Sequence, residues 1–404
     1  MTTFPKLEAE NAQYVLDTAE LIVKSTRERR AGSVGEKQAQ NIIHNELKKY
    51  CDETKQETFK THPGAGTTAE KLLCVLLIVC VFLFSYSTNH GNAVSASIVL
   101  FASLIIFCVF CYKFIFDGKK LDFITHSRKS ANLLGIRYSR AETQARVVLV
   151  ARSDAPQSLR SYIFGNKAQY ILSLSSIIGN TCLFVSTLFF LFSGAPENTA
   201  FYKVLGGLCF AFTPFYVISV FHINSKRVTS GISTSIVPSA ILLAVLKQFQ
   251  ENSFRYEKTE ICCLIAGSDY SSRAGAYAFA NRYKRLYRDV PTIFIPVEEI
   301  TNSKKLSVFF HDGGGTTGSE DLANIICEAG ANLGLKLQPE NHLFGSGAFT
   351  PFSKNHFPSC SLGTSKAYTS KCFFANGDKL SDISKKSVAD VGSLIIETLN
   401  YYDV

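Results

Sequence analysis

Four long apolar stretches constrain the fold of this chain most, because a folded protein must place each of them either in a membrane or in a core. They cover Leu72–Tyr86, Ala93–Phe116, Tyr170–Ser193 and Val204–Ile223. A hydrocarbon core of about 30 Å requires ~20 apolar residues in a helix, and three of the stretches supply that length. The first is shorter and would have to include Ser87–His90 or thin the bilayer. We therefore expect four transmembrane helices, the alternative being buried helices of a large soluble protein.

The distribution of basic residues predicts the orientation of these helices. The four stretches pair into two hairpins whose tips, Ser87–Asn92 and Gly194–Lys203, contain one Lys and no Arg, whereas residues 117–169 are rich in both. By the positive-inside rule, the termini and all soluble segments are then cytoplasmic, in an integral protein of a bacterial plasma membrane. The net charge is +9, from 42 Lys and Arg against 33 Asp and Glu. Because there is no basic helix and no aromatic-basic repeat, we expect no nucleic-acid partner.

The twelve cysteines do not indicate a disulfide framework. Six lie inside the apolar stretches, where Cys behaves as a small hydrophobic residue. Cys262 and Cys263 are adjacent, so in a strand their side chains would point to opposite faces of the sheet. Free thiols in a reducing compartment fit this pattern best.

The soluble segments 1–70, 117–169 and 225–404 alternate between helix and strand patterns. Helices are expected at Ala9–Arg27, Arg273–Arg285, Ser319–Leu333 and Ser387–Tyr401. Another helix is expected to begin at Ser33, which forms a capping box with Glu36. Apolar strands are expected at Ala145–Ala151, Ile261–Ala266 and Pro291–Val297. This alternation predicts a three-layer α/β sandwich around a mostly parallel sheet. The three segments would form one domain, with hairpins at 71–116 and 170–224 inserted into its loops.

Five stretches, in order along the soluble segments, resemble the di-zinc aminopeptidases of peptidase family M28, especially bacterial members with membrane hairpins inside the peptidase domain. They are RRAGSVGEKQAQNIIHNEL, VVLVARSDAP, GISTSIVPSAILLAVLKQF, LIAGSDYSSRAGAYAFANRY, and SGAFTPFSKNHFPSCSL followed by FFANGDKLSDIS. The third resembles the Gly-Ala-Asn-Asp segment of the family, and the fourth resembles the strand that ends in paired glutamates. Of the family's Gly-Leu-x-Gly helix start, only Gly275 is present.

The resemblance also implies where a metal site would lie. The family binds two zinc ions through His and carboxylate ligands and uses a Glu as general base. The corresponding positions are Ser153 and the adjacent Asp154 for the His-x-Asp motif, Thr234 for the bridging Asp, Asp269 for the general base, Tyr270 and Glu298 for carboxylate ligands, and Phe374 for the last His. Hydroxyl groups and a Phe ring are poor ligands for zinc. We therefore expect no metal, no cofactor and no catalytic residue, with Asp269 and Asp154 as relics.

The function expected from this pattern is that of a pseudopeptidase. Arg152 is expected to pair with Asp154 or Asp269 in place of the metal charge, or else to be a solvated arginine. The remaining cleft, formed by Arg152, Ser153, Thr234, Tyr270, Glu298 and Phe374, would hold a peptide or a membrane-protein partner in a complex of unknown oligomeric state. The alternative is a membrane-bound M28-type aminopeptidase or hydrolase with repurposed chemistry around Asp154, Asp269 and Glu298. A transport component is less consistent with spans that contain almost no charge.

Overall fold

The computed structural model describes residues 4–116, 125–159, 168–197, 199–270, 272–342, 346–364 and 378–403. The chain divides into two compact units. Unit 1 consists of Met1–Pro63, His126–Ser158 and Lys226–Val404, and unit 2 consists of Gly64–Thr125 and Leu159–Ser225.

A five-stranded sheet forms the centre of unit 1. Its strands are β1 (Glu53–Thr61), β2 (Arg128–Arg137), β3 (Ala145–Arg152), β6 (Thr259–Ala266) and β7 (Thr292–Pro296), in the order β1-β2-β6-β3-β7. The pairs β3–β6 and β3–β7 are parallel, whereas β1–β2 and β2–β6 are antiparallel. The sheet is therefore mixed, with β2 running opposite to the other four strands, so the prediction of a mostly parallel sheet describes the strand directions but not the antiparallel pairs at the β1 edge. It missed β1 and β2, because β1 is a half-exposed edge strand rich in charged residues and β2 begins with exposed basic residues.

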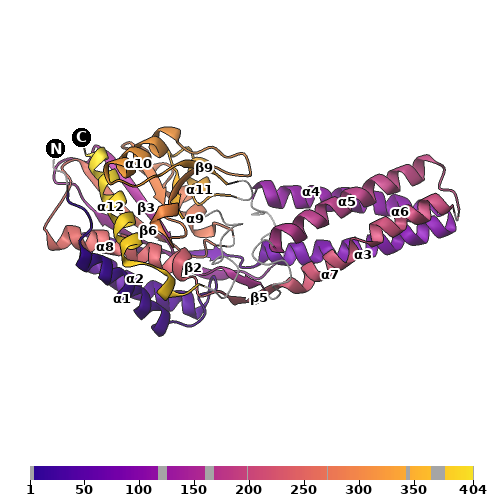
Figure 1. Ribbon diagram of the computed structural model, residues 1–404, viewed down its shortest axis with the longest axis horizontal. Coiled ribbons are helices and arrows are strands. Elements are labelled where there is room, and N and C mark those ends of the chain that lie inside the picture. The colour runs from indigo at the N-terminus through magenta and orange to yellow at the C-terminus, as the bar shows by residue number, and fades with distance from the viewer. Residues whose placement is uncertain are drawn as a thin grey trace. The chain divides into compact units, whose positions relative to one another are not determined.

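Helices cover both faces of this sheet, as the predicted sandwich requires. On one face lie α1 (Ala9–Ser25), α2 (Val34–Tyr50), α8 (Val237–Glu251), α10 (Glu320–Asn332) and α12 (Lys385–Tyr402), which share a core with the sheet (Figure 1). On the other face, α9 (Ala274–Tyr283) packs with Phe352 and Phe357 against the sheet. Cys263 lies in the first core and Cys262 in the second, so the prediction that they point to opposite faces is confirmed.

Shorter elements complete the described structure. They are β4 (Gln157–Leu159), β5 (Ile223–Val228), η3 (Ile232–Ile236), η4 (Leu286–Arg288), η5 (Ser303–Lys305), β8 (Ser307–His311), β9 (Pro339–Asn341), α11 (Thr350–Ser353), β10 (Ser361–Gly363) and η6 (Leu380–Asp382). Strands β10, β8 and β9 form a three-stranded sheet, and β4 pairs with β5. Bridges from Phe294 to Ser359 and from Val297 to Leu362 join the β7 edge to the segment that contains β10.

The start of α2 has the expected capping arrangement. The Ser33 hydroxyl accepts a hydrogen bond from the backbone N–H of Glu36 at 3.2 Å. The Glu36 carboxylate in turn accepts one from the N–H of Gly32 at 2.6 Å, one residue before the cap. These bonds satisfy donors that the first helical turn leaves unpaired. They also fix the Glu36 side chain, which is 1% exposed, in the interior of unit 1.

Unit 2 is built from the apolar stretches. It contains α3 (Ala65–His90), α4 (Ala93–Phe116), α5 (Ala168–Phe192), α6 (Ala200–Phe210) and α7 (Thr213–His222), packed around a core of their own. The tips of the two hairpins lie side by side, since a Cβ added at Gly91 would meet the Ala195 carbonyl oxygen at 3.1 Å. The first predicted stretch extends in both directions to form α3, and the helix includes Ser87–His90.

The fourth predicted span is interrupted near its middle. Its two halves, α6 and α7, are separated at Ala211 and Phe212. Pro214 has no backbone N–H to donate to the carbonyl of Phe210, which breaks the helical hydrogen-bond ladder at this point. The proline therefore accounts for the break.

Five helical segments are long and apolar enough to cross a membrane by length and composition. Four lie in unit 2: Ala65–His90, Ala93–Tyr112, Ile171–Phe192 and Ala200–His222. The fifth, Ile232–Glu251, is 94% buried inside unit 1, where it contributes to the core beside the sheet. The chain is thus compatible with a membrane protein.

Candidate functional site

The carboxyl ends of three neighbouring strands place the predicted site residues in one region of unit 1. Strand β3 ends at Arg152, followed by Ser153 and Asp154, and β6 is followed by Asp269 and Tyr270. Because β3 is parallel to both β6 and β7, the carboxyl ends of all three strands meet at one edge of the sheet. In open α/β sheets this edge is the usual position of a ligand site.

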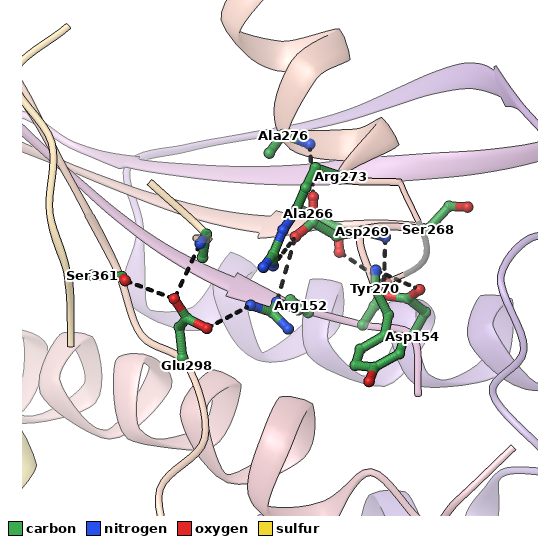
Figure 2. Close-up of polar contacts among 12 residues, drawn as sticks. Arg152, Asp154, Ala266, Ser268, Asp269, Tyr270, Arg273, Ala276, Glu298 and Ser361 are labelled. Atoms are coloured by element: carbon green, nitrogen blue, oxygen red, sulfur yellow. Dashed lines mark hydrogen bonds and ion pairs between the residues drawn. The ribbon is translucent and has the colours of Figure 1, made fainter. Parts of the chain in front are cut away.

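Arg152 lies between two carboxylates at this edge (Figure 2). Its Nε is 3.4 Å from Oδ2 of Asp269, and its Nη2 is 3.5 Å from Oε2 of Glu298. Arg152, Asp269 and Glu298 are 3%, 2% and 4% exposed, so the ion pairs are inside the protein. The expectation of a solvated arginine was wrong. The alternative expectation, that Arg152 pairs with Asp269, is confirmed. We call Arg152, Arg273, Asp269 and Glu298 the ion cluster.

Further hydrogen bonds hold both carboxylates of the ion cluster in place. Oδ1 of Asp269 accepts the backbone N–H of Ala276 in the first turn of α9, where the helix dipole favours a negative charge. Oε1 of Glu298 accepts the Ser361 hydroxyl at 2.6 Å and the Ala348 N–H at 3.0 Å. Arg273 adds a second cation, with Nη1 3.7 Å from Oδ2 of Asp269. Both oxygens of each carboxylate therefore have a polar partner, which a buried ion pair needs.

The charges in this region shift the pKa of Glu298 and Arg152. Burial alone would raise the pKa of Glu298, but His342, Arg273 and Arg152 outweigh burial and hold it well below the usual range. Burial lowers the pKa of Arg152, with a further decrease from Arg273, while the facing carboxylates oppose the change. Both groups have the charges that an ion pair requires, because an arginine pKa begins far above neutral pH.

Asp154 is separate from the ion cluster and faces another acid. Its two oxygens accept the backbone N–H groups of Asp269 at 3.0 Å and Tyr270 at 2.9 Å. Burial, together with the nearby carboxylates of Glu36 and Asp269, raises the pKa of Asp154 to about 8. Burial also raises the pKa of Glu36, despite the hydrogen bonds it accepts. Oε1 of Glu36 accepts the N–H of Ser268 at 2.6 Å and the Ser153 hydroxyl at 3.2 Å.

The segment that corresponds to the bridging Asp lies in the π-helix η3. Thr234 is 1% exposed, and its hydroxyl has no hydrogen-bond partner in the described structure. The backbone around it is held by two charged side chains. Arg29 donates to the Ser230 carbonyl at 2.5 Å, and the Asp378 carboxylate accepts the N–H of Ser233 at 3.1 Å. Burial lowers the pKa of Arg29 to about 10 against the opposing effect of Asp154, Asp378 and Glu36.

The structure therefore brings some of the predicted site residues together. Arg152, Asp269 and Glu298 share ion pairs, and Asp154 contacts the backbone of Asp269 and Tyr270. Ser153 points toward Glu36 and Gln40 rather than into the ion cluster. Phe374 lies outside the described residues. Among the predicted cleft residues that the structure describes, Tyr270 alone is half-buried, and Arg152, Ser153, Thr234 and Glu298 are almost inaccessible to solvent.

Several residues of this region were not predicted from the sequence as part of the site. They are Arg29, Glu36, Arg273, His342 and Asp378. Glu36 was recognised only as a helix cap, although it is in the N-terminal stretch that carries the family resemblance. Arg273 lies two residues before Gly275, and the motif around this glycine could have directed attention to Arg273. Asp378 lies in the FFANGDKLSDIS stretch that carries the family resemblance, whereas nothing in the sequence pattern marks His342.

Solved structures with a similar fold include glutaminyl cyclases and zinc aminopeptidases. A glutaminyl cyclase from Fimbriiglobus ruber superposes with a TM-score of 0.55 at 9% identity, covering 99% of this chain and 97% of the other. The aminopeptidase from Aneurinibacillus sp. strain AM-1 gives 0.56 at 10% identity, with 98% and 93% covered. The zinc aminopeptidase BSAP from Bacillus subtilis gives 0.56 at 11% identity, with 97% and 95% covered. At such identities the likeness shows the fold alone.

A family model supports the same assignment from sequence. Residues 212–399 match the model of peptidase family M28. Curated proteins yielded no match to the chain. The family model and the solved structures agree, so this is an M28 peptidase-like protein, as its motifs indicated.

The residues present do not fit the two zinc ions that the family implies. Zinc needs unprotonated nitrogen, sulfur or carboxylate donors that converge on one point. Here the guanidinium of Arg152 lies between Asp269 and Glu298, and the other oxygen of each carboxylate is already hydrogen-bonded. Across the described ranges, no three His, Cys, Asp or Glu side chains are grouped closely enough to hold a metal ion.

Proposed function

We propose that this M28-like protein is a membrane-anchored, catalytically inactive subunit that binds a partner. The observation that carries the proposal is the position of Arg152, whose buried guanidinium pairs with Asp269 and Glu298. A fixed cation at this point neutralises the carboxylates as a metal would. It cannot, however, bind and polarise a water molecule or a substrate carbonyl as a metal does.

The membrane part of the proposal rests on unit 2. Its helices expose large apolar side chains to the outside, among them Phe82, Phe101, Ile105, Phe189 and Phe192. So many exposed large apolar side chains on one unit are unusual for a soluble monomer and support contact with lipid. The low Lys and Arg content of the hairpin tips supports a cytoplasmic position for unit 1.

The partner-binding part rests on what remains accessible near the ion cluster. Arg152, Ser153, Thr234 and Glu298 are too deeply buried to touch a partner, which leaves Tyr270 as the described residue of the predicted cleft with a reachable side chain. Tyrosine is enriched among residues that dominate binding energy. We propose that Tyr270, together with Phe374, contacts a peptide segment of a membrane protein.

The same region suggests a second candidate, a hydrolase with metal-free chemistry. Asp154 has a pKa of about 8 and lies beside a second buried acid, Glu36. A carboxylic acid that is protonated near neutral pH can act as a general acid. In this reading Asp154, Asp269 and Glu298 would be the chemically active groups.

Complementation of a deletion strain distinguishes the two candidates. We expect Asp154→Asn to restore the cellular function, because binding does not use this acid. Tyr270→Ala should reduce the function, whereas the matched control Tyr401→Ala, at an exposed tyrosine on α12, should not. Turnover of aminoacyl-p-nitroanilides or of N-terminal glutamine peptides by the purified protein, abolished by Asp154→Asn, would replace the first candidate with the second.

A further inference from the structure

A cavity of about 630 Å³ in unit 1 is separate from the residues of the ion cluster. Three segments line it: residues 301–304 leading into η5, residues 334–336 after α10, and residues 382–390 around the start of α12. This volume is in the range of sites that hold small molecules. Leu335 is the one large apolar side chain in its lining, and no aromatic ring is present there. Apart from Leu335 and Gly334, the lining residues carry polar or charged groups, so a ligand of this cavity would make polar contacts alongside contacts with aliphatic carbon atoms.

Each of the three segments contributes a lysine to the cavity. Lys304, Lys336 and Lys386 all line it. The lysine ion pairs found within the described ranges lie elsewhere, at Lys24, Lys49, Lys55 and Lys247. Three exposed lysines that line one cavity from separate segments, without a carboxylate ion pair in the described structure, favour an anionic group on the ligand.

The position of α12 adds to the positive potential. This helix of 18 residues begins at Lys385, and the Ser384 hydroxyl at its cap accepts the N–H of Ser387 at 3.0 Å. The remaining N–H groups of the first turn and the positive end of the helix dipole favour an anion at this point.

Acidic and hydroxyl groups line the same cavity. Asp390 is held by the Ser303 hydroxyl, which donates to Oδ2 at 2.6 Å. Asp382 is close by and accepts a bond of 3.3 Å from Ser381. Carboxylates beside lysines would repel a ligand that is anionic throughout. They accept hydrogen bonds from ligand hydroxyl groups, so the ligand must combine an anionic group with hydroxyls.

We propose that this cavity binds a phosphorylated polyol, with the phosphate at Lys304, Lys336 and Lys386 and the hydroxyl groups at Asp382 and Asp390. A free polyol phosphate and the headgroup of a glycerophospholipid share this chemistry. The site is independent of the ion cluster and of the proposed partner contact at Tyr270.

Titration of the full-length protein in detergent tests the proposal. With glycerol 3-phosphate as the soluble probe, we expect saturable binding that glycerol alone does not give and that weakens with added salt. The double variant Lys304→Gln/Lys386→Gln should lower the affinity at least tenfold, because it removes about two charge-assisted hydrogen bonds. The matched control Lys24→Gln/Lys48→Gln, on α1 and α2, should bind as the unmodified protein does.

A second arm separates the two sources of the ligand. Protein in nanodiscs of phosphatidylcholine is compared with protein in nanodiscs that also contain phosphatidylglycerol, using protection of Lys304 and Lys386 from acylation as the readout. Protection by the lipid but not by glycerol 3-phosphate would support the proposal with a lipid headgroup as ligand. Protection by neither probe, or equal affinity of the lysine double variant and its control, would overturn it. Circular dichroism verifies that both variants fold.

Discussion

Arg152 is a buried cation that pairs with two carboxylates in the interior of unit 1. Its side chain is 3% exposed and is within 3.5 Å of two carboxylates that also accept other hydrogen bonds. Transfer of an ion into a protein interior costs several kcal/mol, and only full pairing offsets that cost. Removing one member of such a network leaves the others charged, buried and without their partner.

Arg152→Met should therefore destabilise the protein by about 3–5 kcal/mol, measured as a loss of thermal stability of the full chain in detergent. The matched control is Arg282→Met. Arg282 pairs with Glu57 at 3.0 Å but is on the surface, so its loss should cost at most about 1 kcal/mol. Adding Asp269→Asn and Glu298→Gln to Arg152→Met should restore part of the stability, since the unpaired charges are then gone. Equal effects of Arg152→Met and Arg282→Met would contradict this account of the ion cluster.

Asp154 should make the stability of the protein depend on pH. Its pKa is about 8 in the folded state, against 3.8 for an ordinary Asp, because it is buried and close to Glu36 and Asp269. Between these values the folded state retains a proton that the unfolded state releases, so stability falls as the pH rises. In Asp154→Asn we expect the loss of folding stability between about pH 5 and pH 8 to be smaller by on the order of 4 kcal/mol. Part of the slope should remain, since the pKa of Glu36 is also raised. An unchanged slope in urea titrations would show that Asp154 is ionised at neutral pH.

At the scale of helices and strands, the burial of an element determines whether it can be predicted from the sequence. Strands β3, β6 and β7 are covered on both faces and form continuous apolar runs, which is why they could be predicted. Strand β1 has no such run because one side of it faces solvent, and it was missed together with β2. The α6–α7 break was also missed, because hydropathy over a long window does not register a single proline.

The close packing of α9 against β6 depends on Gly275, which was also noted in the sequence motif. A Cβ at Gly275 would lie 2.2 Å from the carbonyl oxygen of Gly267 and 2.6 Å from Oδ1 of Asn132. Gly275→Ala should therefore push α9 from the sheet and move Ala276, whose N–H binds Asp269. We expect a loss of at least about 2 kcal/mol in thermal unfolding. Ala278→Ser, on the same helix at a half-buried position, should cost less than about 1 kcal/mol. Similar melting temperatures for the two variants would show that the backbone accommodates the methyl group.

At the scale of the whole molecule, the orientation in the membrane is open to a direct test. Asn89 and Glu197 lie at the hairpin tips, and Glu142 is exposed in unit 1. In intact cells, a membrane-impermeant thiol reagent should modify Asn89→Cys and Glu197→Cys but not Glu142→Cys. The native Cys51 is a poor reporter, because burial raises the pKa of its thiol to about 12. Modification of Glu142→Cys in place of the tip cysteines would reverse the orientation.

The candidate site was predictable from the sequence only where charge and motif order coincide. Asp269 and Glu298 follow apolar strands, so their position at the strand ends could be predicted, and Arg152 could be placed beside them. The depth of burial could not be predicted, because it depends on distant chain segments such as those of Ala348 and Ser361, which hydrogen-bond to Glu298. For the same reason the sequence suggested an open cleft where the structure has a closed ion cluster.

The central claim is that a buried arginine has replaced the metal of an M28-like domain, and the metal content of the protein tests it most directly. The full-length protein, purified in detergent without chelators, should contain far less than one zinc ion per chain by elemental analysis. A di-zinc aminopeptidase carried through the same purification gives the reference for retained metal. Thermal stability should also be unchanged by a chelator. A tightly held pair of zinc ions in this protein, with lower stability after chelation, would contradict the account.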